Sequence, residues 1–243
     1  MSATTTVNTT PTATSYQRFN IYHRLEHILA LSSFVVLAVT GLPQKFAEQG
    51  WAQGLISFFG GIDTTRQIHH LAAIVLMMEV VYHIAAIGYR LIVRRVRPSM
   101  LPTIRDASDA VGTLLFNVGL RKQRPQGGRY TFEEKVEYWA FVWGTVVMVI
   151  TGFMLWNPIA TTSILPGEFI PAAKTAHGSE ALLAVLAIII WHMYSVHVRR
   201  FNKSMWTGKL TEHEMLEEHP LELADIKSGL AVRPIAPIDL KKR

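Results

Sequence analysis

The stretches HHLAAIVLMMEVVYH (residues 69–83) and HGSEALLAVLAIIIWH (residues 177–192) decide the fold. Each begins and ends with histidine and is otherwise nearly free of charge, which is typical of a helix inside a lipid bilayer. Because a helix rises about 1.5 Å and turns about 100° per residue, the terminal histidines of each stretch lie roughly 21 to 22 Å apart and roughly on one face. The spacing predicts two levels of facing histidines, which suits two haems stacked within one bilayer.

Composition also indicates a membrane protein. The 243 residues are 49% hydrophobic and only 17% charged, whereas soluble domains are about 25% charged, and the mean hydropathy is +0.22. Four apolar stretches reach the ~20 residues that span a bilayer, at about residues 21–42, 67–93, 136–156 and 176–198. Because lipid offers the backbone no hydrogen-bond partners, these stretches should be helices. The predicted fold is an all-α, integral membrane, four-helix transmembrane bundle.

The absence of cysteine restricts the chemistry of any cofactor. With no Cys in the chain, covalent c-type haem, cysteine-ligated iron–sulfur clusters and disulfides are excluded from this subunit. Any redox cofactor must therefore be held by His or Met. The net charge of +6 does not form a basic stripe interleaved with aromatic residues, so we expect no nucleic acid among the partners.

Charge predicts how the chain is oriented and divided. Cations gather at the chain ends and in the loop between the second and third spans, while the opposite loops offer only Lys45, Arg66 and Lys174. The positive-inside rule then places both termini in the cytoplasm and the bundle in the cell's inner membrane. We expect a disordered cytoplasmic tail over residues 1–18, the haem-binding bundle over 19–200 and a cytoplasmic tail over 201–243. That last tail could pack beneath the bundle or extend towards a partner.

Two connecting segments carry apolar residues but are too short to cross a membrane. Residues 51–59 are rich in aromatic side chains and are predicted to lie in the outer interface. Residues 103–120 place apolar side chains near helical spacing with charges between them, which favours an amphipathic helix on the cytoplasmic face over an ordinary loop.

The histidines outnumber the positions that two haems require. Two neutral imidazoles from opposite helices make a low-spin iron site that exchanges electrons without binding substrate. His69 and His177, near the outer ends of their spans, form the first predicted pair. For the inner level, spacing favours His83 as the partner of His192, but nothing geometric excludes His27. The surplus of histidines leaves a third haem as an alternative to two.

Several motifs carry a resemblance to a known family. They are HRLEH (residues 23–27), TGLP (40–43), Ile68-His69, His177-Gly178, HMY (192–194) and SMWTGK (204–209). Over about residues 19–220 the chain resembles the cytochrome b (gamma) subunit of membrane-bound formate dehydrogenases and the related di-haem cytochromes b of hydrogenases and thiosulfate reductases. The resemblance implies that His69 and His177 bind one b-type haem and that His27 and His192 bind the other. It thus places His27 ahead of His83, which departs from the family pattern.

The function implied is electron transfer across the membrane. The resemblance favours a subunit of a respiratory complex that links a partner redox subunit, such as an iron–sulfur or multihaem cytochrome c subunit, to quinone as an exchangeable substrate. Such a subunit is not expected to carry out substrate catalysis alone. Two alternatives are a self-sufficient transmembrane reductase of the cytochrome b561 kind and a haem-free membrane anchor or transporter.

Overall fold

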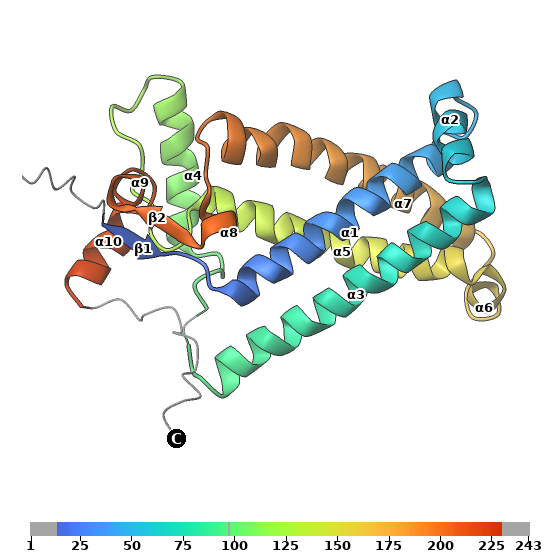
Figure 1. The fold of residues 1–243 in the computed structure, drawn as a ribbon, viewed down its shortest axis with the longest axis horizontal. Coiled ribbons are helices and arrows are strands. Elements are labelled where there is room, and N and C mark those ends of the chain that lie inside the picture. Colours follow the sequence, from blue (N-terminus) through green and yellow to red (C-terminus); the bar gives the residue numbers. More distant parts are fainter. Residues whose placement is uncertain (1–13, 97, 230–243) are drawn as a thin grey trace, which may run out of the picture.

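Four long helices form an elongated bundle in the computed structural model, which describes residues 14–96 and 98–229 (Figure 1). They are α1 (Ile21–Lys45), α3 (Ile62–Ile92), α5 (Phe132–Trp156) and α7 (Phe169–Ala187), which continues through the π-helical turns η1 (Ile188–His192) and η2 (Tyr194–Val198). All four are long and apolar enough to cross a membrane. The predicted four-helix membrane bundle is confirmed.

The helices pack as two pairs, α1 against α3 and α5 against α7, and α1 also contacts α7. Small side chains such as Ser33, Ala72 and Ala173 occupy buried positions, which lets helix backbones approach closely. Large apolar side chains such as Met78 and Ile189 are exposed on the bundle surface. This distribution is the one expected where lipid rather than water surrounds the helices.

Short helices close one end of the bundle, here called the α2/α6 end. They are α2 (Gly50–Phe58), between α1 and α3, and α6 (Pro158–Thr162), between α5 and α7 (Figure 1). Trp51 and Phe58 of α2 are exposed. The aromatic segment over residues 51–59 is therefore helical for most of its length.

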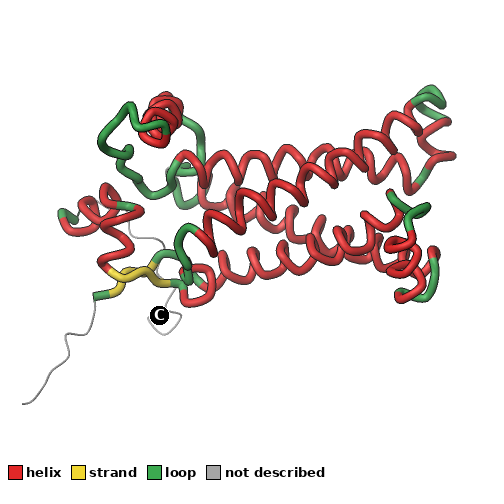
Figure 2. Tube along the Cα trace, turned by 90° about the horizontal axis from the view of Figure 1, so that it is seen from above, coloured by secondary structure: helices red, strands yellow, loops and turns green. Residues whose placement is uncertain are grey.

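The opposite end, here called the terminal end, carries both described ends of the chain (Figure 2). Its elements are β1 (Ser15–Gln17), α4 (Ile104–Asn117), α8 (Ser204–Thr207), β2 (Lys209–Thr211), α9 (Glu212–Glu218) and α10 (Pro220–Lys227). The helix predicted over residues 103–120 is confirmed as α4, which begins with a capping box between Thr103 and Asp106. It runs across the long axis of the bundle (Figure 1) and exposes Ile104, Val111 and Leu114.

The described segments nearest the two chain ends pack together, which corrects the prediction of a wholly disordered N-terminal tail and decides between the two alternatives for the C-terminal tail. β1 pairs antiparallel with β2, Ser15 opposite Thr211, so part of the tail predicted to be disordered is a strand. Arg18 is 1% exposed and donates a 2.6 Å hydrogen bond to Glu222, which also accepts from Arg129. The segment after residue 200 therefore packs beneath the bundle up to residue 229. Residues 1–13 and 230–243 of the predicted tails lie outside the described residues.

Candidate functional site

One pair of histidines faces each other towards the α2/α6 end. His69 of α3 and His177 of α7 have ring centroids 6.4 Å apart. Thr40 Oγ1 lies 3.0 Å from Nδ1 of His69, and Thr151 Oγ1 lies 2.9 Å from Nδ1 of His177. The structure thus brings together the two residues that the sequence predicted as the outer pair.

The threonines fix which ring nitrogen carries the proton. Each hydroxyl lies 2.6 Å from a carbonyl one turn earlier in its own helix, Thr40 from Val36 and Thr151 from Val147. A hydroxyl has one proton to donate, and that carbonyl takes it. The hydroxyl therefore accepts from Nδ1–H of the histidine, and Nε2 is left with its lone pair available to a metal.

Glycines next to these threonines leave room for the imidazole rings. A Cβ atom on Gly41 would lie 2.9 Å from Cε1 of His69, and one on Gly152 would lie 3.3 Å from Cε1 of His177. Both distances are shorter than ordinary van der Waals contacts, which for carbon atoms are about 3.5 to 4 Å. Each Thr-Gly step therefore orients and accommodates a histidine of the neighbouring helix.

A second pair faces each other nearer the terminal end. His27 of α1 and His192 of η1 have ring centroids 6.3 Å apart. Glu137 of α5 lies 2.7 Å from Nδ1 of His192, and a carboxylate there accepts Nδ1–H and leaves Nε2 free. The π-helical turn η1, in which the Met193 N–H bonds to the carbonyl of Ile188, absorbs one extra residue. His192 accordingly follows His177 by one residue more than His83 follows His69.

His83 lies in a different environment from His27 and His192. Its Nδ1 is 2.9 Å from Glu26 of α1 and its Nε2 is 3.1 Å from the hydroxyl of Tyr138 of α5. Both ring nitrogens are therefore engaged by protein groups. Helical spacing, which favoured His83 opposite His192, describes one helix at a time and takes no account of α1, which contacts both α3 and α7 and presents His27 to His192.

An internal repeat relates the two helix pairs. Glu26, His27 and Thr40-Gly41 of α1 correspond to Glu137, Tyr138 and Thr151-Gly152 of α5, each 111 residues later. In each half the glutamate bonds one histidine of the paired helix and the threonine bonds another. We did not single out Glu26, Thr40, Glu137, Tyr138 or Thr151 from the sequence as supports for the histidines. The repeated spacing of Glu to Thr-Gly is the signal that identifies them.

The remaining histidines and arginines have other neighbours. His70 stacks on Trp156 with ring centroids 4.0 Å apart, and His197 lies near Phe201. His23 Nε2 lies 2.6 Å from Arg90. Arg24 donates to the carbonyls of Met205 and Trp206 and so ties α1 to α8.

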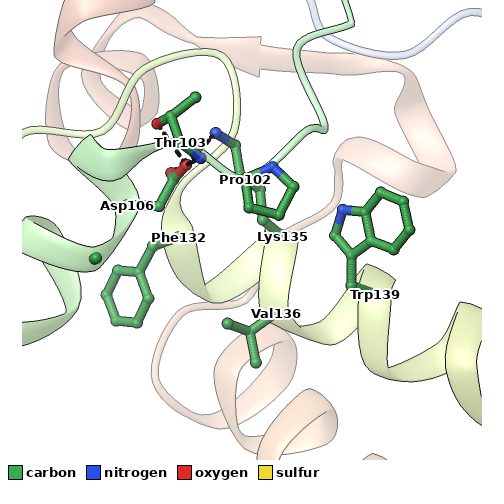
Figure 3. Close-up of a pocket in the computed structure, with 8 residues that line it drawn as sticks. Pro102, Thr103, Asp106, Phe132, Lys135, Val136 and Trp139 are labelled. Atoms are coloured by element: carbon green, nitrogen blue, oxygen red, sulfur yellow. Dashed lines mark hydrogen bonds and ion pairs between the residues drawn. The ribbon is translucent and has the colours of Figure 1, made fainter.

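A pocket of about 270 Å³ lies between α4 and α5, away from both histidine pairs (Figure 3). Asp106 and Lys135 form an ion pair at 2.9 Å within it. Although burial alone would raise it, hydrogen bonds from Lys135 and Thr103 hold the pKa of Asp106 below its ordinary value. Because both charges are satisfied by each other, the ion pair serves to attach α4 to the bundle.

The two facing pairs fit a b-type haem. A metal–imidazole bond is about 2 Å long, so two imidazoles on opposite sides of one metal have ring centroids a little over about 6 Å apart. The observed separations are 6.3 and 6.4 Å. Three of the four rings have their Nδ1 held by a threonine or glutamate, the outer-shell support that metal-binding histidines usually have.

The chain is similar to known membrane cytochromes b. Residues 111–208 match the family described as prokaryotic cytochrome b561. The chain is 22% identical over 207 residues to the formate dehydrogenase cytochrome b556(fdo) subunit of Escherichia coli K12, covering 84% of this chain and 89% of that protein. It is 21% identical over 215 residues to the nitrate-inducible formate dehydrogenase cytochrome b556(Fdn) subunit of the same strain, covering 88% and 93%. These matches support a membrane cytochrome b of the formate dehydrogenase type, and the cytochrome b family implies haem b binding.

Proposed function

We propose that this chain carries electrons across the membrane between a partner redox subunit and the quinone pool, through two b-type haems. His69 and His177 would hold one haem, and His27 and His192 the other. The observation that carries the proposal is the pair of facing imidazole sets at two depths of one bundle, 6.4 and 6.3 Å between centroids. His83, engaged by Glu26 and Tyr138, is not part of either set in this proposal.

The protein's own contribution is to preset the ligands. A b-type haem held by two imidazoles supplies reversible one-electron exchange at its iron, with no open position for a substrate. Thr40, Thr151 and Glu137 accept Nδ1–H from their histidines, so the imidazole rings would move little when the charge of a bound haem iron changes.

We further propose that the chain lies in the inner membrane of the cell and that its terminal end faces the cytoplasm. Most cations of the described residues flank the spans at that end, including Arg90, Arg94 and Arg129, as the positive-inside rule requires. Quinone would then exchange near the His27/His192 level. Residues near His192, such as Tyr194, which is exposed, are candidates for contact with it.

The partner would dock at the α2/α6 end. There α2 presents Trp51 and Phe58, 52% and 80% exposed, close to the His69/His177 level. The relatives are named as subunits of formate dehydrogenases, which supports a partner redox subunit for this chain, and we propose one of the iron–sulfur or multihaem cytochrome c kind.

Haem quantitation with reduced-minus-oxidised spectra tests the ligand assignment. We expect two haems per purified wild-type chain, one in His27→Ala and two in His83→Ala. Loss of a haem in His83→Ala but not in His27→Ala would assign the inner site to His83 instead. Three haems in the wild type would show that a further site exists, and a colourless protein would refute the electron-transfer proposal.

A further inference from the structure

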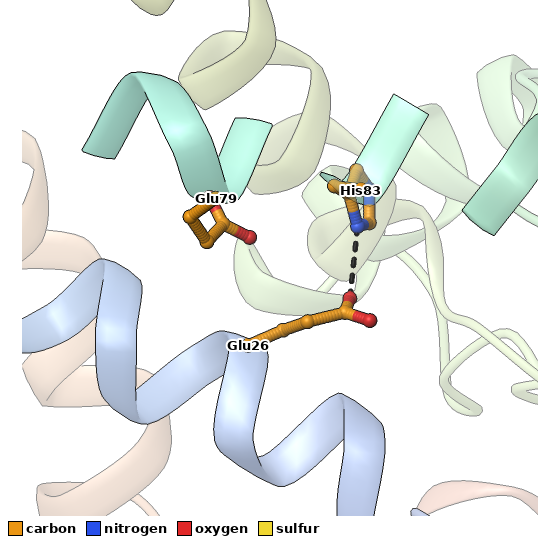
Figure 4. Close-up of side chains that lie close together, drawn as sticks. All are labelled: Glu26, Glu79 and His83. Atoms are coloured by element: carbon orange, nitrogen blue, oxygen red, sulfur yellow. Dashed lines mark hydrogen bonds and ion pairs between the residues drawn. The ribbon is translucent and has the colours of Figure 1, made fainter. Parts of the chain in front are cut away.

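Three side chains that could bind a metal meet between α1 and α3. They are Glu26 of α1 and Glu79 and His83 of α3, with one donor atom from each within 4.8 Å of the others (Figure 4). Glu79 is 8% exposed, and the side chain of Glu26 is 10% exposed. Two carboxylates held this close together out of water repel each other unless a cation or a proton lies between them.

One donor atom of this cluster has no partner. Oε2 of Glu26 bonds His83, but among the described residues Oε1 has no hydrogen-bond partner although it is buried. A buried polar atom without a partner destabilises the fold, and more so when it is charged. A carboxylate oxygen in this position, beside a second carboxylate and an imidazole, is suited to coordinate a cation.

The other half of the bundle lacks the second carboxylate. Glu137 holds His192 as Glu26 holds His83. Glu79 lies four residues before His83 and ten residues after His69. The equivalent positions in the other half are Ile188, four before His192, and Ala187, ten after His177. The position is therefore apolar beside His192, which faces His27, and acidic beside His83, which faces Tyr138.

We propose that Glu26, Glu79 and His83 bind one divalent transition-metal cation, with Zn²⁺ the best match. Two carboxylates and one imidazole are ligands that Zn²⁺ accepts, whereas Mg²⁺ and Ca²⁺ favour oxygen alone. Three atoms about 2 Å from a common ion lie at most about 4 Å apart. Small carboxylate rotations, with release of the proton between Nδ1 of His83 and Glu26, would complete the site, and Nε2–H of His83 would then donate to the hydroxyl of Tyr138.

Arg90 and His23 lie near the cluster and limit its affinity. Arg90 donates to His23 Nε2, and His23 precedes Glu26 by one turn of α1. Since two carboxylates face one guanidinium, the surroundings remain favourable to a cation. The site is separate from the facing histidine pairs, so the proposal does not rest on electron transfer.

Equilibrium dialysis with ⁶⁵Zn²⁺, on haem-loaded protein without a histidine tag in lipid nanodiscs, tests the site. The variants are Glu79→Gln and His83→Gln, and the control is Glu180→Gln, which removes a carboxylate of α7 that lies against Gly144. We expect one tightly bound Zn²⁺ in the wild type and in Glu180→Gln. Loss of a ligand should weaken binding at least about tenfold in the other two variants.

X-ray absorption at the zinc edge of the wild type gives an answer even if a variant does not assemble. One nitrogen from imidazole together with oxygen ligands at about 2 Å is expected. Absence of binding to the wild type, ligation by several imidazoles, or equal affinity in Glu79→Gln and His83→Gln would overturn the proposal. Haem content measured on the same samples reports separately on the proposed function.

Discussion

Replacing Gly41 with alanine should weaken one haem site while leaving the other intact. The new Cβ would lie 2.9 Å from Cε1 and 3.4 Å from Nδ1 of His69. The ring cannot swing away freely, because Nδ1 is held by the buried hydroxyl of Thr40, the residue next to the substitution. Either the imidazole loses this hydrogen bond or α1 and α3 move apart.

The size of the effect follows from the contact distances. Ordinary carbon contacts begin at about 3.5 Å, so His69 or its helix must shift by several tenths of an ångström. Overpacking of this kind costs about 1–3 kcal/mol, which corresponds to roughly 5- to 150-fold weaker haem binding. The same change at Gly152, where the new Cβ would lie 3.3 Å from Cε1 of His177, should fall near the lower end of that range.

Haem titration of the purified variants, followed by spectroscopy, measures this series. The control is Gly88→Ala in α3, where a new Cβ meets nothing within 4 Å among the described residues and alanine favours the helix by about 1 kcal/mol. We expect Gly88→Ala to match the wild type, Gly152→Ala to be weakened slightly and Gly41→Ala to be weakened most. Unchanged haem affinity in Gly41→Ala, or equal losses in Gly41→Ala and Gly88→Ala, would refute the idea that the glycine makes room for His69.

Two further changes probe the supports of the site and of the terminal end. Thr151→Val removes the acceptor for Nδ1–H of His177, which makes the imidazole a weaker electron donor to iron. Potentiometric titration should therefore show one haem with a raised midpoint potential, and Thr151→Ser should restore the wild-type value. An unshifted potential in Thr151→Val would contradict this role. Burial, aided by Arg18, lowers the pKa of His219 below its ordinary 6.5, so packing of residues 201–229 should be stable above about pH 6.5 and weaken as the pH falls towards the lowered value, because the undocked segment binds the extra proton. Limited proteolysis against pH should show this loss in the wild type and a flatter profile in His219→Gln. Burial raises the pKa of Glu218 above its ordinary 4.5, which opposes the trend in both proteins alike, so equal profiles for the two would argue against His219.

The spans could be predicted because their signal lies within single stretches of chain. Length and apolar composition alone determine whether a helix crosses a membrane, and each predicted span lies within or overlaps an observed helix. The choice between His27 and His83 lies outside that signal. It depends on which helices touch at the terminal end and on the extra residue in η1, and only the family resemblance pointed to His27.

The terminal end was harder to predict for a similar reason. β1 and β2 have three residues each, too few for an alternating pattern to stand out. Their pairing joins opposite ends of the chain. A threonine- and serine-rich start reads as disordered when taken alone, and the burial of Arg18 against Glu222 and Tyr130 depends on partners far along the sequence.

In the proposed assignment, one difference between the repeated halves accounts for two haems rather than three. Each facing pair joins one half to the other, because His69 and His27 lie in the first half and His177 and His192 in the second. At the terminal level, His192 meets an imidazole at His27, whereas His83 meets the phenol at the equivalent position, Tyr138. That phenol lies 3.1 Å from Nε2 of His83, less than the roughly 4 Å that an iron between two donors needs. In this proposal the number of haems depends on a single difference between equivalent residues, and the same difference leaves His83, with Glu26, to the proposed cation site.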